Sequence, residues 1–198
     1  MNFKFEFLPA LATAVVILGW FVFAGIFLFR KTPKAAPEQK RDSKSIVGLI
    51  LQALSYAVVG LFHRAPFTPI SSGSRAVAVS LSLAAMLVAV VSISIVKAAV
   101  KTLGKEWSVA ARVVEGHKLA TEGPYRFVRH PIYSGMLGML LATGLVISHW
   151  LALIAAIVIY FIGTVIRIRS EERLLREALG PEFEAYARSA PALVPGLY

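Results

Sequence analysis

The sequence predicts an all-α integral membrane protein with about five transmembrane helices. The chain has 198 residues, of which 57% are hydrophobic and only 16% are charged, and its mean hydropathy is +0.70. Soluble domains are only about 45–50% apolar. Several uninterrupted apolar runs also reach the roughly 17–25 residues with which a helix crosses a bilayer. Both observations favour a multi-pass membrane protein over a soluble one.

Three apolar runs predict the first three transmembrane helices. They extend over residues 8–29, 46–62 and 77–96, and none contains an interior Asp, Glu, Lys or Arg. The first run exceeds the roughly 7–15 apolar residues of a secretory signal, and no small-residue cleavage pattern follows it. We therefore expect a retained anchor in this position.

A fourth apolar block predicts a helical hairpin. Residues 132–166 are too many for one span, and Ser148, His149 and Trp150 interrupt the block near its middle. Divided there, the block yields two spans of about 16–17 residues, at the short end of the spanning range. The alternative is a protein of four spans, in which the last block is partly re-entrant.

The basic residues favour five spans, with the N-terminus outside and the C-terminus in the cytoplasm. In that orientation, 18 of the 21 Lys and Arg residues fall within the inner segments 30–44, 97–129 and 167–188. Positively charged loops remain in the cytoplasm. The net charge of +10 then reflects contact with anionic membrane lipids. No basic stretch is interleaved with aromatic residues as a nucleic-acid surface requires, so we expect no nucleic-acid partner.

The chain divides into two regions at residue 96. Residues 1–96 form an N-terminal membrane region of three spans, whereas residues 97–198 combine the hairpin with two polar segments. These segments, 97–131 and 167–198, fall on the same cytoplasmic side and can therefore meet. We expect them to form a pocket for a cofactor beneath the last helices.

The C-terminal tail has the pattern of an amphipathic helix. Glu171, Leu174, Leu175, Ala178 and Leu179 recur at helical spacing, as on a helix that packs one face against a neighbour. Gly180-Pro181 then predicts a helix end followed by a second short helix. We expect residues 167–186 to close over the pocket as a lid that excludes water.

The stretch TEGPYRFVRHPIYSG, residues 121–135, combines turn residues with polar side chains directly before the fourth span. Gly123-Pro124 begins a turn, and Pro131 follows His130 at a position where the first turn of a helix tolerates proline. A helix N-terminus beside an Arg and a His attracts carboxylate or phosphate groups. The same residue types are common anchors at the membrane interface, so both interpretations remain open from spacing alone.

A second cluster of polar side chains follows the fifth span. Arg167 and Glu171 are four residues apart and share a helical face, with Glu172 beside them. An exposed pair of this kind contributes only about 0.3–0.5 kcal/mol, but at the level of the His130 loop it would complete a polar pocket. The chain has no cysteine, and its histidines lack the helical spacing of a metal site, so we expect no metal.

Taken together, these residues resemble the isoprenylcysteine carboxyl methyltransferase family, which has relatives among the phospholipid N-methyltransferases. The matching segments are HKLATEGPYRFVRHPIYSG at 117–135, RIRSEERLL at 167–175, LGPEFEAY at 179–186 and the terminal ALVPGLY. The resemblance implies an integral membrane methyltransferase that uses S-adenosylmethionine and releases S-adenosylhomocysteine. It also implies a cofactor site under the cytoplasmic ends of the last helices, without a Rossmann domain.

The resemblance also implies roles for individual residues. Arg167 is implied as the catalytic residue, associated with the methyl acceptor. Ala110 departs from the family pattern, which has a cofactor-contacting amide residue at this position. The implied cofactor-binding residues are His117, Leu119, Ala120, Tyr125, His130, Pro131, Ile132, Tyr133, Glu171 and Glu172.

The expected function is therefore methyl transfer to a lipophilic small molecule or lipid that enters from the bilayer. A carboxylate acceptor fits the arginine, because an ionised carboxylate is already nucleophilic and an Arg side chain can hold it through two hydrogen bonds. Three alternatives remain: N-methylation of a phospholipid or amine, an NADPH-dependent reductase of the membrane sterol type, and a membrane scaffold without enzymatic activity. The reductases carry a similar His-Pro-x-Tyr segment but are usually much longer.

Overall fold

The structure, a computed structural model, describes residues 7–29, 38–65, 67–68, 74–109, 111–114, 116 and 118–194. Within these residues, five long helices form a bundle. They are α1 (Phe7–Leu28), α2 (Ser45–Leu61), α3 (Arg75–Leu103), α4 (Pro131–Ile147) and α5 (Trp150–Leu179). The shorter elements are β1 (Glu38–Arg41), η1 (Gly104–Glu106), β2 (Arg112–Val114), η2 (Gly123–Arg126) and α6 (Pro181–Ser189).

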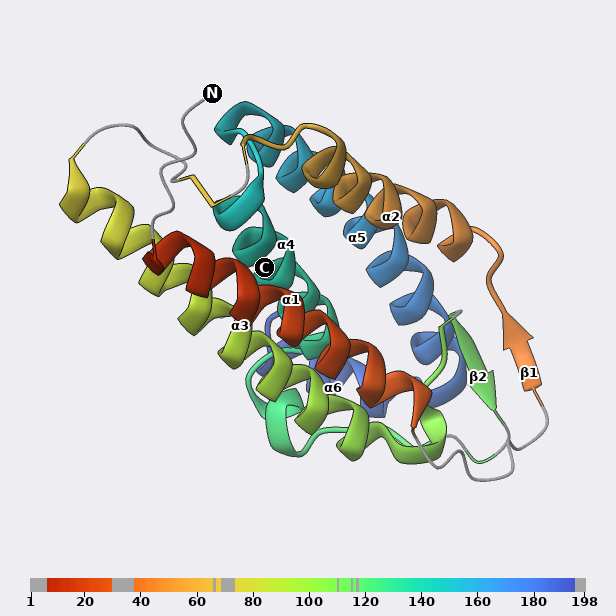
Figure 1. The fold of residues 1–198 in the computed structure, drawn as a ribbon. Coiled ribbons are helices and arrows are strands. Elements are labelled where there is room, and N and C mark those ends of the chain that lie inside the picture. Colours follow the sequence, from red (N-terminus) through yellow and green to blue (C-terminus); the bar gives the residue numbers. More distant parts are fainter. Residues whose placement is uncertain are drawn as a thin grey trace.

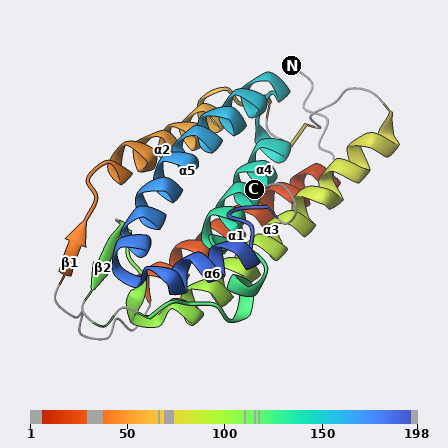
Figure 2. The same ribbon diagram turned by 180° about the vertical axis from the view of Figure 1, so that it is seen from behind.

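The helix α4 lies between two pairs of helices. On one side α1 lies along α3, and on the other side α2 lies along α5 (Figures 1 and 2). Successive helices run in alternating directions through the bundle (Figure 1). The short elements β1, β2, η2 and α6 all lie at one end, where α1, α3 and α5 finish and where α2 and α4 begin.

The helices have the length and composition of membrane spans. Among the described residues, α1, α3 and α5 have 22, 29 and 30 residues and are long and apolar enough to cross a bilayer, whereas α2 and α4 are shorter apolar helices. The helices coincide with the predicted apolar runs, and the break between Ile147 and Trp150 divides the predicted hairpin as expected. An all-helical, multi-pass integral membrane protein is thereby confirmed.

A two-stranded antiparallel sheet is the element that the sequence did not predict. The sequence identifies residues 30–44 only as a basic inner segment, but β1 pairs with β2, with Arg41 opposite Arg112. Strands of four and three residues are too short to show a period of two. The backbone N–H of Asp42 donates to the Ala111 carbonyl at 3.1 Å, and the Asp42 carboxylate forms an ion pair with Arg173 of α5. The sheet therefore ties the start of α2 to the polar part of α5.

Small residues allow the helices to approach closely. A Cβ atom at Gly48 of α2 would meet the backbone oxygen of Gly163 and the side chain of Arg167 in α5. Similarly, a Cβ atom at Gly135 in α4 would meet Val96 of α3. Within a membrane, van der Waals packing rather than water exclusion drives helix association, so small residues at the contact are favoured. These contacts hold α2 and α3 against the hairpin.

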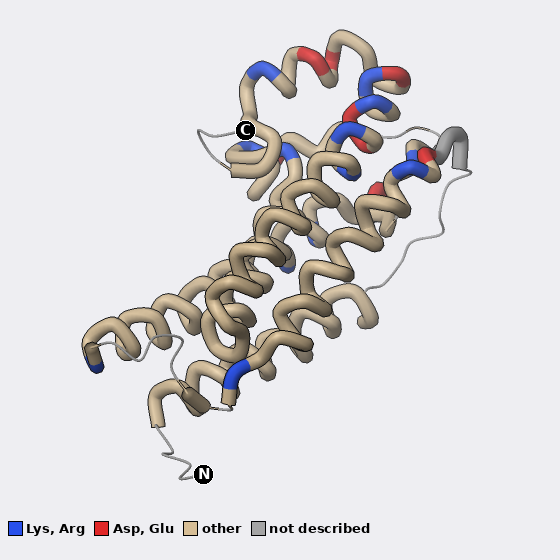
Figure 3. The backbone as a smooth tube through the Cα atoms, turned by 90° about the horizontal axis from the view of Figure 1, so that it is seen from above, with Lys and Arg blue, Asp and Glu red and all other residues tan. Residues whose placement is uncertain are grey.

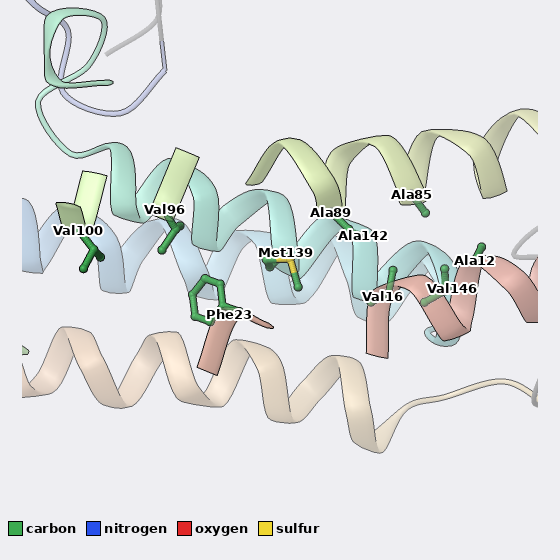
Figure 4. Close-up of a cluster of buried hydrophobic side chains, with 10 residues drawn as sticks. All are labelled: Ala12, Val16, Phe23, Ala85, Ala89, Val96, Val100, Met139, Ala142 and Val146. Atoms are coloured by element: carbon green, nitrogen blue, oxygen red, sulfur yellow. The ribbon is translucent and has the colours of Figure 1, made fainter. Parts of the chain in front are cut away.

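The apolar core is formed mainly by small side chains. One cluster joins α1, α3 and α4, and its members Ala12, Ala89 and Met139 are fully buried (Figure 4). A second cluster joins α2, α4 and α5 around Leu140 and Tyr160. Since α4 contributes to both clusters, it is the element that fixes the positions of the two outer helix pairs.

Charged residues gather at one end of the bundle (Figure 3). There α5 continues beyond its apolar part and ends at Gly180, whose φ of 52° lies in the left-handed region that glycine favours. The helix α6 then folds back, with Phe183 only 1% exposed. This confirms the predicted helix end at Gly180-Pro181 and the restart after it.

Candidate active site

The C-terminal segment, residues 191–193, holds the loop that precedes α4, residues 127–130. The backbone N–H groups of Arg129 and His130 donate to the carbonyls of Pro191 and Ala192, each at 2.9 Å. The hydroxyl of Ser134 donates to the Leu193 carbonyl at 2.5 Å. His130 is the N-cap residue of α4, and Pro131 occupies its first turn. The two polar segments that were predicted to share one side of the membrane therefore do meet.

Tyr133 connects the loop to α5. Its hydroxyl accepts a hydrogen bond from Arg167 Nε at 2.8 Å and donates one to Glu171. On one face of the ring lies the Arg167 guanidinium, 5.2 Å from the ring centre. The His130 ring stacks at 5.7 Å with an angle of 16° between the planes. The orientations of these four side chains are thus mutually fixed.

His130 lies between two carboxylates. Its Nδ1 is 3.4 Å from Glu171 Oε2, and its Nε2 is 3.3 Å from Glu172 Oε1. A carboxylate only accepts hydrogen bonds, so both ring nitrogens donate when the imidazole is protonated. Glu172 also binds Arg129 at 2.8 Å and Arg176 at 3.1 Å. The site therefore holds more cationic than anionic side chains.

The pKa of His130 is raised above its ordinary value of 6.5. Burial by itself would lower this pKa, because it disfavours the charged imidazolium. The hydrogen bonds and negative charges of Glu171 and Glu172 outweigh the burial. The two carboxylates therefore favour the protonated form of His130, next to the N-terminus of α4.

The pH dependence of stability is expected to report on this cation. Because the folded pKa lies above the unfolded value, His130 contributes stability that is fully present below about pH 6.5 and is lost as the pH rises through the folded pKa. The melting-temperature advantage of the wild type over His130→Gln should therefore shrink as the pH rises above about 6.5. Substituting the exposed His149 in the same way should show no such trend. An advantage that grew with pH would indicate a neutral buried imidazole.

One donor of Arg167 has no partner among the described residues. The side chain is 5% exposed, and its Nη2 donates to the Val109 carbonyl at 2.6 Å. The buried Nη1 has no acceptor within the part of the chain that the structure describes. A buried cationic N–H without an acceptor costs several kilocalories per mole in order of magnitude unless a ligand binds it. An acceptor oxygen beside Arg167 would satisfy this donor.

A cavity of about 360 Å³ adjoins these residues. Its polar wall includes Tyr125, Arg129, His130, Tyr133, Arg167 and Glu171. Its apolar wall includes Phe23, Phe27, Leu49, Trp107 and Met136. The volume lies in the range of roughly 300–1,000 Å³ that is typical of small-molecule sites. A ligand with a polar head and an apolar tail matches these two walls.

The structure brings together most of the residues proposed from the sequence. Tyr125, His130, Ile132, Tyr133, Arg167 and Glu171 line the cavity. Leu119, Ala120, Pro131 and Glu172 are not among its lining residues. His117 and Ala110 lie outside the described residues.

The sequence did not identify the part of the lining that comes from the N-terminal half. Phe23, Phe27 and Leu49 lie within long apolar runs, where nothing distinguishes a cavity-lining side chain from a lipid-facing one. Gln52 is the exception, since an amide inside an apolar span is costly and could have been noticed on that ground.

The region that contains most of this site matches a known protein family. Residues 83–177 match the model of the isoprenylcysteine carboxyl methyltransferase (ICMT) family. The resemblance inferred from the sequence motifs is thereby confirmed. The matched region contains most of α3, the loop before α4, α4 itself and nearly all of α5. The helices α1 and α2 precede it.

Curated relatives of this ICMT-like chain include plant and bacterial proteins. Protein-S-isoprenylcysteine O-methyltransferase B of Arabidopsis thaliana is 35% identical over 101 residues, which are 50% of this chain and 51% of that protein. Cobalt-zinc-cadmium resistance protein CzcN of Cupriavidus metallidurans is 38% identical over 104 residues, which are 48% of this chain and 44% of that protein. The chain thus spans about half the length of the curated relatives it matches.

Proposed function

We propose that the chain is an integral membrane enzyme that transfers a methyl group from S-adenosylmethionine to the carboxylate of a lipophilic acceptor. The observation that carries this proposal is the cavity itself, whose lining combines Arg167 and the His130–Glu171 pair with apolar side chains. The match to the isoprenylcysteine carboxyl methyltransferase family over residues 83–177 supports it. The plant relative is named for O-methylation of isoprenylcysteine.

The polar wall fits the groups that S-adenosylmethionine presents. Glu171 can accept hydrogen bonds from an ammonium or a ribose hydroxyl, and the N-terminus of α4, which begins at His130, can attract a carboxylate. Tyr125 offers an aromatic face to an adenine ring or a sulfonium. When bound, the cofactor would supply an electrophilic methyl group. We propose the same binding role for Ile132 and Tyr133, and on the resemblance alone for His117, Leu119, Ala120, Pro131 and Glu172.

Arg167 is proposed to hold the methyl acceptor. Its unpartnered Nη1 is a charge-assisted donor, and such donors bind carboxylates at short distances. Methyl transfer requires alignment of the two reacting groups more than acid–base catalysis, and a carboxylate fixed by Arg167 satisfies that need. An amine acceptor must be neutral to react, and a buried guanidinium would not stabilise it. Arg167 therefore favours O-methylation.

The proposed topology has five spans, with the N-terminus outside and the C-terminus in the cytoplasm. Its support is the alternating direction of the five helices and the concentration of charge at the end that contains the cavity. In this arrangement, residues 1–96 form the membrane region and residues 97–198 form the catalytic region, with the cofactor pocket at the cytoplasmic side. Residues 167–186 would close it, so bound cofactor should slow proteolysis of the tail.

Binding of S-adenosylhomocysteine tests the cofactor site directly. We expect purified protein in detergent to bind it in a calorimetric titration, and His130→Ala and Glu171→Ala each to weaken binding about tenfold or more, a loss of roughly 1.4 kcal/mol. His149→Ala and Glu182→Ala are matched controls, because both side chains are exposed. These controls should bind like the wild type. Folded wild-type protein that binds NADPH but not S-adenosylhomocysteine would establish the reductase interpretation instead.

A further inference from the structure

Arg129 connects three parts of the molecule at the polar end of the cavity, and the proposed reaction does not use it. It belongs to the loop before α4 and lines the cavity, and its side chain is only 14% exposed. Its Nε donates to Glu172 of α5 at 2.8 Å. Its Nη1 donates to the carbonyl of Ala187, at 2.9 Å, and to that of Ala190. One side chain thus joins the loop, α5 and the end of α6.

The end of α6 is a favourable place for this guanidinium. The last carbonyl groups of a helix have no partner within that helix, and their partial negative charge favours a cation. The helix α6 ends at Ser189, with Ala190 as its C-cap. The backbone N–H of Arg129 also donates to the Pro191 carbonyl at 2.9 Å. Side chain and backbone of Arg129 therefore both bind the chain where α6 ends.

The bond from Arg129 to Glu172 leads to His130. Glu172 is 6% exposed and is not among the cavity-lining residues. Its Oε1 accepts from Arg129 and lies 3.3 Å from His130 Nε2. Its Oε2 accepts from Arg176 at 3.1 Å. Because Arg129 and His130 share one oxygen, the position of that oxygen beside the imidazole depends on Arg129.

Arg176 would draw Glu172 away from His130 if Arg129 were absent. The Arg176 side chain is 45% exposed and also binds Glu184 of α6 at 2.8 Å. It holds the outer oxygen of Glu172, so the carboxylate would turn toward solvent once Arg129 no longer held the inner one. His130 Nε2 would then lose its acceptor, and a buried N–H without an acceptor is unfavourable. The imidazole would consequently change its orientation.

We infer that Arg129 is a positioning residue, which holds Glu172 against His130 and thereby makes the cofactor site depend on the docking of α6. A binding site requires side chains whose orientations are fixed by a supporting set of hydrogen bonds. His130 Nδ1 lies 3.4 Å from Glu171 in the cavity wall, so a displaced imidazole also releases this carboxylate. The inference rests on the proposed function, in which His130 and Glu171 hold the cofactor.

A double-mutant cycle tests whether Arg129 acts through Glu172. The variants are Arg129→Met, Glu172→Gln and the two combined, and the measurement is the affinity of purified protein for S-adenosylhomocysteine. We expect Arg129→Met to weaken binding about tenfold in the wild type, which corresponds to about 1.4 kcal/mol, but about twofold or less when residue 172 is already glutamine. Arg126→Met is the matched control, because Arg126 is exposed three residues earlier. This control should bind like the wild type.

The ring nitrogens of His130 report on its surroundings without any ligand. In protein with isotopically labelled histidine, the nitrogen resonances of this ring can be assigned with His130→Gln. We expect them to shift in Arg129→Met, because Nε2 loses its acceptor, and to stay unchanged in Arg126→Met. This measurement decides the question for any variant that binds S-adenosylhomocysteine too weakly for a titration.

The outcomes separate this inference from the proposed function. An equal loss of affinity from Arg129→Met in both backgrounds, with unchanged His130 resonances, would overturn the inference and make Arg129 a direct contact of the cofactor. A lower melting temperature with undiminished affinity would also overturn it, and Arg129 would then only stabilise the docking of α6. Absence of S-adenosylhomocysteine binding by folded wild-type protein would refute the proposed function and the inference with it.

Discussion

Replacing Arg167 with methionine is expected to lower kcat/KM for methyl transfer about a hundredfold, equivalent to about 2.7 kcal/mol. The guanidinium is buried, and its free Nη1 is the donor available to the acceptor carboxylate. Loss of a charge-assisted hydrogen bond costs about 1.5–3 kcal/mol, and the acceptor also loses its alignment. The measurement is the rate of methyl ester formation with labelled cofactor, together with the affinity for S-adenosylhomocysteine, which should change only a few-fold.

Two further variants separate charge from geometry. Arg167→Lys retains the positive charge but lacks the planar fork, so its kcat/KM should lie between those of the wild type and the methionine variant. Arg169→Met is the matched control, because Arg169 is exposed on the same helix and should retain activity within about twofold. If Arg167→Met reduced S-adenosylhomocysteine affinity as much as it reduced turnover, Arg167 would belong to the cofactor site and not to the acceptor site.

Much of the fold could be predicted because each helix leaves a separate signal in the sequence. Apolar length alone located α1, α2 and α3, and the polar interruption at Ser148 and His149 divided the hairpin. Gly180 and Pro181 marked the end of α5, since a residue in the left-handed region followed by proline cannot continue a helix. The pairing of β1 with β2 left no such signal, because it depends on a contact between segments about 70 residues apart.

The site could be predicted only where polar residues stand out against an apolar background. His130, Tyr133, Arg167 and Glu171 were identified in this way, and the structure places them in direct contact. Glu172, which is also proposed to bind the cofactor, forms ion pairs with Arg129 and Arg176 and is not among the cavity-lining residues. The sequence shows that Glu171 and Glu172 are adjacent near the end of α5, but it does not show how each side chain is oriented. The packing of α6 and the loop decides which of them faces the cavity.

Substituting Gly48 with alanine is expected to destabilise the protein by about 1–3 kcal/mol, because it overpacks the contact between α2 and α5. The new Cβ would meet the backbone oxygen of Gly163, which cannot move aside as the end of a flexible side chain can. The helices must therefore separate. Thermal unfolding of the purified protein, compared in one detergent, measures the loss.

Gly60→Ala in the same helix is the matched control for Gly48→Ala. A Cβ atom at Gly60 would meet nothing within 4 Å, so this variant should be neutral or more stable by up to about 1 kcal/mol, as alanine favours the helix. Similar melting of the two variants would show that α2 can part from α5 without cost. If instead only Gly48→Ala is destabilised, the melting temperatures would show that close packing of α2 on α5 keeps α2 beside Arg167.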